Sequence, residues 1–271
     1  MSESLPLLYE TSGAVAIFTL NRPQARNALT PELVCRLADA VRDFLEDPAL
    51  RVGVLTGTGD KAFCAGGDLG TMLPLMSGER APADDWDRRV LEEPFVMAAS
   101  SLRDYPIDKP LIAAINGPCL AGGMEMVLGT DIRIAAEHAI FGLPEVRRGV
   151  IPFAGSLARL TRQIPHALAM ELLLTGDTFT AEQALRFGLI NRIVPAADVL
   201  PQAMALAQRI AENGPVAVQA VKRTVRESSG LPLAQAYALE DEAKRIVMAS
   251  EDAREGPRAF MEKRPARFTG R

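Results

Sequence analysis

Two glutamates and a glycine-rich turn are the residues whose types and spacing could do chemistry. Glu125 directly follows the run Ala121-Gly122-Gly123-Met124, and Glu145 follows Pro144 further along the chain. Glycine lets a backbone approach a ligand closely, and the free amides at the start of a helix attract negative charge. A carboxyl group among apolar residues can have its pKa raised towards the range useful for proton transfer. The pattern favours acid/base chemistry on a substrate whose oxygen becomes negative. In the alternative interpretation, Glu125 only caps the helix and Glu145 lies on a loop without a catalytic role.

The elements around these glutamates can be predicted from apolar runs and turn residues. The apolar run 111–115 leads into the Gly117-Pro118 turn, and the chain restarts as the apolar segment 124–129. This pattern predicts a strand, a tight turn and a short buried helix with Glu125 in its first turn. Further strands are predicted at 15–20, 52–56, 131–135, 139–141 and 189–194, and helices at 30–46, 92–103, 166–173, 180–187, 199–211, 216–227, 234–249 and 252–262.

The chain divides into two regions by the character of its elements. Residues 1–195 mix strands and helices, whereas residues 196–271 are helical throughout, so we expect a core followed by a C-terminal helical region. Residues 70–90 contain Pro74, Gly78 and Pro82 and are expected to be irregular. A loop of that length is usually functional or mobile.

Composition excludes several classes of protein. The chain has 271 residues, 48% hydrophobic residues and a net charge of −4, so it lacks the basic excess that nucleic acids or anionic membranes would require. Three cysteines and two histidines show no metal-ligand spacing, and we expect no metal and no cofactor. The segment Met1 to Glu10 has no export pattern, so a cytoplasmic protein is expected. The glycines at 57–62 loosely match a dinucleotide-binding fingerprint, but the residues after them break the helix that such a site needs.

Several segments together resemble the crotonase (enoyl-CoA hydratase/isomerase) superfamily over essentially the whole chain. They are Leu20-Asn21-Arg22-Pro23 with Asn27-Ala28-Leu29, then 61–69, Asn116-Gly117 with 121–125, 131–135, 141–145 and 184–191. The resemblance implies an α/β fold, a crotonase-like spiral of ββα units with a C-terminal helical region for oligomerisation and capping of the active site. It also implies a homotrimer or a hexamer built as a dimer of trimers, and an acyl-CoA thioester substrate, so that coenzyme A is part of the substrate.

The resemblance also assigns roles to the candidate site. The amides of Gly67 and Gly122 are expected to form an oxyanion hole for the thioester carbonyl. Each backbone donor of this kind typically lowers the activation barrier by a few kcal/mol. Glu125 is expected to act mainly on water that adds at Cβ, and Glu145 mainly on the proton at Cα. Because isomerases of the superfamily often keep only the second acid, both glutamates favour an enoyl-CoA hydratase. Another crotonase reaction, such as isomerisation or a specialised dehydration, and a non-catalytic acyl-CoA-binding subunit are the alternatives.

Substrate-binding residues are carried over from the same resemblance. Ala65 is expected to offer its backbone to the adenine, Arg26 to meet the phosphates, and Phe260 with Lys263 to reach the nucleotide end in the same or a neighbouring subunit. Each of these has an ordinary surface or core role as its alternative. Phe153 stands where many hydratases have glycine, and the loop at 70–89 is longer than in the simplest members. Both differences lie where acyl specificity is set, so a short straight-chain substrate is not assumed.

Overall fold

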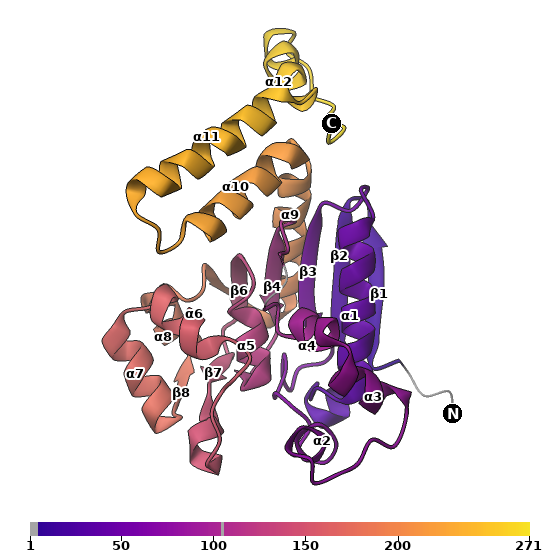
Figure 1. Ribbon diagram of the computed structural model, residues 1–271, viewed down its shortest axis with the longest axis vertical. Helices are drawn as coiled ribbons and strands as arrows, with labels where there is room; N and C mark the ends of the chain where they lie inside the picture. Colours follow the sequence, from indigo (N-terminus) through magenta and orange to yellow (C-terminus); the bar gives the residue numbers. More distant parts are fainter. Residues whose placement is uncertain (1–4, 104–105) are drawn as a thin grey trace.

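The computed structural model describes residues 5–103 and 106–271. Residues 1–4, which belong to the segment searched for an export pattern, lie outside the described residues. Figure 1 shows two parts, a core of strands wrapped by helices and a set of C-terminal helices that project away from it. In the part of the chain that the structure describes, no helix is both long and apolar enough to cross a membrane.

A six-stranded sheet forms the backbone of the core. Its order is β1-β2-β3-β4-β6-β9, and every pair is parallel except the β1–β2 hairpin. The strands are β1 Leu7–Ser12, β2 Val15–Leu20, β3 Val52–Gly57, β4 Leu111–Ile115, β6 Ile132–Ala136 and β9 Arg192–Val194. Parallel neighbours need long crossovers. Each crossover between parallel strands contains at least one helix, and the crossovers after β4 and β6 also contain strands of a second sheet.

The core has a second sheet of three strands, which includes the strand predicted at 139–141. It contains β5 Cys119–Leu120, β7 Ile140–Gly142 and β8 Thr178–Thr180, in the order β5-β7-β8. The strand predicted at 139–141 therefore lies next to β5 and β8, where Cys119 pairs with Phe141. This small sheet holds the turns that precede both glutamates.

The helices of the core follow the predicted pattern in most places. They are α1 Pro31–Glu46, α2 Met72–Ser77, α3 Asp85–Glu92, α4 Pro94–Ser100, α5 Gly122–Val127, α6 Ser156–Gln163, α7 His166–Thr175, α8 Ala181–Arg186 and α9 Val199–Ala211, with short 3-10 turns η1 Pro23–Ala25, η2 Pro144–Arg148 and η3 Ala196–Asp198. The prediction that residues 70–90 are irregular was wrong, because α2 and most of α3 lie there. Asp84 caps α3 by accepting from the Asp87 amide, and the Asp87 carboxylate binds Arg80. These local side-chain bonds give the segment its order.

The two faces of the large sheet are covered by different helices. Residues of α1, α4 and α5 belong to the larger buried cluster on one side, whereas α9 packs on the other side against β2, β3, β4 and β6. The helix α9 therefore belongs to the packing of the sheet. The division of the chain at residue 195 stays a prediction.

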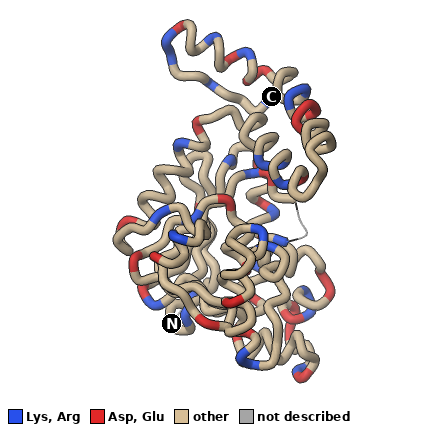
Figure 2. The backbone as a smooth tube through the Cα atoms, turned by 90° about the vertical axis from the view of Figure 1, so that its left-hand side faces the viewer, with Lys and Arg blue, Asp and Glu red and all other residues tan. Residues whose placement is uncertain are grey.

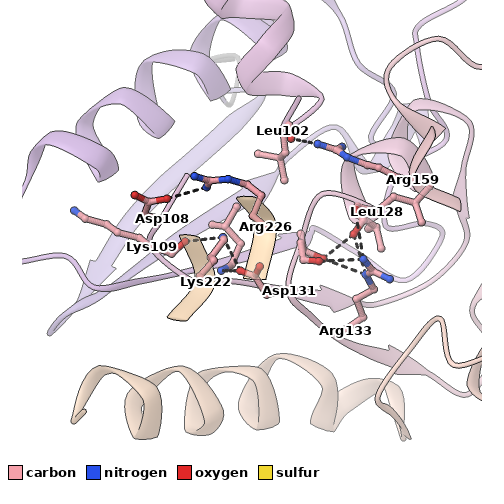
Figure 3. Close-up of polar contacts among 12 residues, drawn as sticks. Leu102, Asp108, Lys109, Leu128, Asp131, Arg133, Arg159, Lys222 and Arg226 are labelled. Atoms are coloured by element: carbon pink, nitrogen blue, oxygen red, sulfur yellow. Dashed lines mark hydrogen bonds and ion pairs between the residues drawn. The ribbon is translucent and has the colours of Figure 1, made fainter. Parts of the chain in front are cut away.

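The remaining helices, α10 Pro215–Ser228, α11 Leu233–Ala249 and α12 Asp252–Met261, extend from the core (Figure 1). Lys222 on α10 binds the Asp131 carboxylate at 2.7 Å, and Arg226 binds Asp108 at 2.8 Å (Figure 3). None of the residues of α11 is buried within the chain. Figure 2 shows basic and acidic residues interspersed along the chain, with no stripe of one sign.

Candidate active site

Glu125 lies in the first turn of α5 and its side chain is buried, with 4% of its surface exposed. Its Oε1 accepts hydrogen bonds from the Ala154 amide and the Ser156 hydroxyl, both at 2.7 Å. Hydrogen bonds to an ionised group are short and roughly twice as strong as neutral ones. The Ala154 amide and the Ser156 hydroxyl therefore hold this carboxylate in one orientation. The position of Glu125 in the first turn of the short apolar helix α5 confirms the prediction made from the sequence.

Glu145 lies in η2, directly after β7, in a different environment. Its Oε2 is buried, and it accepts no hydrogen bond within the described part of the chain. Burial and, to a smaller extent, the charge of Glu125 together raise the pKa of Glu145 to about 7, although the charge of Arg148 acts in the opposite direction. The two carboxyl groups are thus close enough to interact, and Glu145 is poised to exchange a proton near neutral pH.

Two glycine turns bring Gly67 and Gly122 next to each other. A Cβ atom added at Gly122 would lie 3.6 Å from the backbone nitrogen of Gly67. Across the residues that the structure describes, neither of these two amides donates a hydrogen bond. Ala121, just before Gly122, has φ 50° and ψ −128°, a conformation that costs a residue with a side chain about 1–3 kcal/mol. Its own amide donates to the Gly142 carbonyl at 2.9 Å, which fixes the turn.

Gly123 makes this arrangement possible, although no separate role was predicted for it from the sequence. A Cβ atom there would lie 2.6 Å from Cys64 Cβ and 2.7 Å from the Cys64 carbonyl oxygen. No real side chain fits at such distances, so α5 can approach the segment of Cys64 only with glycine at this position. The glycine pair Gly122-Gly123 was the pattern that indicated a close approach.

Arg133 on β6 is a second residue for which no role was predicted from the sequence. Its guanidinium is buried and donates to the carbonyls of Val127, Thr130 and Leu189 at 2.9, 3.0 and 2.9 Å. It also donates to the Leu128 carbonyl at 3.3 Å (Figure 3). Burial lowers the pKa of Arg133 to about 10. A cation at the C-terminal end of a helix satisfies its free carbonyls and complements its dipole. Arg133 therefore secures the far end of α5, and its position inside the apolar run of β6 was the available sign.

A cleft of about 480 Å³ lies beside Glu125. It is lined by residues of α2 and α4, by Arg103 and by the loop residues Phe153 and Ala154, and the Ala154 amide is the same one that binds Glu125. The ring of Phe153 is half exposed, and its carbonyl accepts a hydrogen bond from Arg103 at 2.8 Å. The structure thus places Phe153 and the 70–89 segment around one cleft.

The candidate nucleotide-binding residues fall into two separate groups. Arg26 and Ala65 are adjacent, because the Ala65 amide donates to the Arg26 carbonyl at 3.0 Å. Phe260, with 83% of its surface exposed, is near the end of α12, and Lys263 follows this helix. Figure 1 shows α12 far along the molecule from α5. Within one chain the structure does not bring the second pair to the glutamates. The described residues contain no group of His, Cys, Asp and Glu arranged to hold a metal ion.

Known proteins resemble this chain over nearly its whole length. A model described as enoyl-CoA hydratase/isomerase matches residues 10–271. Enoyl-CoA hydratase EchA19 of Mycobacterium tuberculosis is 42% identical over 264 residues, which cover 97% of this chain and 96% of the relative. Carnitinyl-CoA dehydratase of Salmonella agona is 37% identical over 275 residues, with all of both chains covered. The crystal structure of enoyl-CoA hydratase from Mycobacterium tuberculosis H37Rv has a TM-score of 0.87 and 39% identity, over 99% of this chain and 100% of that one. The structural match confirms the predicted α/β spiral of ββα units.

Proposed function

Because the chain belongs to the enoyl-CoA hydratase/isomerase family of the crotonase superfamily, we propose that it is an enoyl-CoA hydratase. The reaction is the reversible syn addition of water to the 2,3-double bond of a trans-2-enoyl-CoA. The observation that carries this proposal is the pair of carboxyl groups in unlike environments, one held by two hydrogen bonds and the other with a pKa of about 7. Enzymes assign acid and base roles by placing two titratable groups in such contrasting surroundings.

Each glutamate has a defined step in this mechanism. Glu125 accepts a proton from the water that attacks Cβ, and the Ala154 amide and Ser156 hydroxyl keep its carboxylate aimed at that water. Glu145 donates its proton to Cα in the hydration direction and takes it back in dehydration. Its raised pKa supports this role, because a group that titrates near the working pH is available in both protonation states.

The developing negative charge is assigned to the two free backbone amides. As water adds at Cβ, the thioester carbonyl gains the charge of an enolate oxygen. The amides of Gly67 and Gly122 are near one another and have no partner among the described residues, which supports their role as donors to this oxygen. One such donor typically contributes about 2.7–4 kcal/mol to the transition state. No cofactor takes part in these steps, and coenzyme A enters only as part of the substrate.

Binding of the coenzyme A portion requires residues from two places. We assign Ala65 and Arg26 to the adenine and phosphates, and Phe260 with Lys263 to the nucleotide end of a site in a neighbouring subunit. This assignment needs a homo-oligomer, a trimer or a dimer of trimers. Apolar side chains that α10 and α11 leave exposed support assembly, among them Val221, Val225, Leu233, Tyr237 and Met248. A monomer observed by light scattering would contradict the proposed homo-oligomer. The cytoplasmic location stays a prediction.

Dehydration of a specialised hydroxyacyl-CoA is the second candidate. It is favoured by the 37% identity to a carnitinyl-CoA dehydratase. The same two glutamates would serve, since dehydration is the reverse of hydration. The two candidate functions differ in the acyl group of the thioester on which the protein acts.

The test follows the ultraviolet absorbance of the conjugated thioester after purified protein is mixed with crotonyl-CoA and with a longer trans-2-enoyl-CoA. We expect loss of absorbance with the wild type, and a strongly reduced rate with Glu125→Gln and with Glu145→Gln. Both variants should keep the coenzyme A affinity and the oligomer size of the wild type. Turnover in both variants at the wild-type rate would refute the mechanism. Coenzyme A binding without turnover of any enoyl or hydroxyacyl thioester would indicate a binding subunit.

A further inference from the structure

We propose that the cleft beside Glu125 selects a bulky, apolar and uncharged acyl group, larger than the four carbons of crotonyl-CoA. The inference rests on the proposed function, because it takes Glu125 as the point where the reacting carbons lie. The cleft lies next to that point, because the amide of Ala154 binds Glu125 and the same residue lines the cleft wall. An acyl chain that extends beyond Cβ therefore enters this space.

The size of the cleft exceeds the need of a short chain. If each carbon of an acyl chain takes roughly the volume of one water molecule, ~30 Å³, the one carbon that a crotonyl group has beyond Cβ fills less than about a tenth of the 480 Å³. Small-molecule sites bury most of their ligand's surface, so a poorly filled cleft forfeits binding energy. A chain of about eight carbons or more, or a branched or cyclic group, uses the space better.

The walls of the cleft favour apolar contacts. Met76, Phe95, Met97 and Phe153 supply large apolar side chains from three segments of the chain. The one hydroxyl among the described lining residues belongs to Ser101, and it donates to the Met97 carbonyl at 2.7 Å. A polar acyl group would therefore lose its hydration with no free hydroxyl to replace it.

The charge of the walls argues against a cationic acyl group. The described residues that line the cleft include no carboxylate, and their one charged side chain is the guanidinium of Arg103. Aromatic rings can bind cations through their faces. The ring of Phe95, however, already lies 4.6 Å from the guanidinium carbon of Arg42. The described lining residues therefore offer no carboxylate to a quaternary ammonium such as that of a carnitinyl group, and their one charged side chain has the same sign as that group.

Arg103 also positions the ring that borders the cleft. Its guanidinium donates to the carbonyl of Phe153, which holds the loop and leaves the half-exposed ring at the opening. A long or branched acyl group would cover this ring and remove its apolar surface from water. A crotonyl group is too short to cover it if its Cβ lies at Glu125.

The experiment compares kcat/KM for four thioesters on the full-length wild-type protein: crotonyl-CoA, trans-2-octenoyl-CoA, 4-trimethylammonio-but-2-enoyl-CoA and 5,5-dimethylhex-2-enoyl-CoA. The last two have the same shape and differ in a single atom, nitrogen against carbon, so their ratio isolates the charge. One buried methylene is worth about fourfold in affinity. We expect octenoyl-CoA to exceed crotonyl-CoA by tenfold or more, and the neutral isostere to exceed the cationic thioester by tenfold or more. An equal or greater kcat/KM for crotonyl-CoA, or for the cationic member of the pair, would overturn the proposal.

A binding measurement keeps this result apart from the fate of the proposed function. Octanoyl-CoA should bind tenfold or more tightly than butyryl-CoA by calorimetry, whether or not the protein turns over any enoyl thioester. If the protein shows that affinity ratio but turns over no enoyl thioester, the proposed hydratase function is refuted and the proposed acyl preference is supported. Equal affinities for octanoyl-CoA and butyryl-CoA would refute the proposed acyl preference even if the protein hydrates crotonyl-CoA.

Ala98→Phe tests the cleft with a matched control. Ala98 lines the cleft on α4, so a ring there should occupy the space and lower the ratio of octenoyl-CoA to crotonyl-CoA turnover by tenfold or more. Ala197→Phe introduces the same ring on the exposed turn η3 and should leave the ratio as in the wild type. An unchanged ratio in a folded Ala98→Phe protein would contradict the proposal, and the wild-type panel decides the matter if this variant does not fold.

Discussion

Replacing Glu145 with glutamine should stabilise the folded protein at alkaline pH while it removes the proposed proton donor. Burial raises the pKa of Glu145 from 4.5 to about 7, so between these values the folded protein holds a proton that the unfolded chain has released. The free energy of unfolding therefore falls as pH rises through this window, and the loss is complete above pH 7. A shift of this size corresponds to about 3 kcal/mol, at 1.36 kcal/mol for each pKa unit. Since Glu145 is only partly buried, solvent screening reduces the expected effect to roughly 1–2 kcal/mol.

Thermal unfolding of the wild type and of Glu145→Gln at pH 4.5 and pH 8.5 tests this reasoning. For a domain of this size 1 kcal/mol shifts Tm by about 2–4 °C. We expect the variant to melt about 2–8 °C above the wild type at pH 8.5 and close to it at pH 4.5. Glu171→Gln, on the exposed face of α7, is the matched control and should show no difference that depends on pH. A gain of equal size at both pH values, or a loss at pH 8.5, would refute the argument from burial.

Three other predictions concern catalysis and packing. Ser156→Ala removes one of the two hydrogen bonds to Glu125, which is worth about 1.5–3 kcal/mol for a charged acceptor, so steady-state kinetics should show kcat reduced about 10- to 100-fold with little change in KM; a rise in KM at constant kcat would assign Ser156 to binding instead. Gly123→Ala forces a Cβ against Cys64 and should lower the free energy of unfolding by about 1–3 kcal/mol, measured by denaturation in urea, whereas wild-type stability would mean that α5 moves freely. The kcat/KM for hydration should fall above pH 7 as Glu145 loses its proton, and that for dehydration should rise over the same range, so profiles that stay flat from pH 6 to pH 8 would exclude Glu145 as the group that titrates.

Elements with strong local patterns were predictable from the sequence. The Thr30-Pro31 start and the end of α1 at Glu46 match the structure, as do β2 at Val15–Leu20 and α9 at Val199–Ala211. Their caps, prolines and hydrophobic periodicity lie within the elements themselves, so each signal acts over a few residues. Glu125 in the first turn of a short apolar helix was predictable for the same reason.

Elements without a local pattern were not predictable. All three strands in the small sheet have only two or three residues, too few for an alternating pattern, and two of them, β5 and β8, were not predicted. The helix α3 has a charged sequence and only two buried residues, so it has no continuous apolar face that would have predicted a helix. Its order comes from bonds such as that of Asp87 to Arg80, which form only once the chain has turned back.

The sequence by itself determined the fold class and the family and selected Glu125 and Glu145 as the candidate catalytic acids, because these follow from residue types in a fixed order along the chain. Only the tertiary structure decided how the glutamates differ. Glu125 obtains its hydrogen bonds from Ala154 and Ser156, which are distant in the sequence, whereas Glu145 obtains its raised pKa from burial and from the charge of Glu125. Hydrogen-bond partners, desolvation and charge proximity depend on distances in space, and no spacing along the chain fixes them.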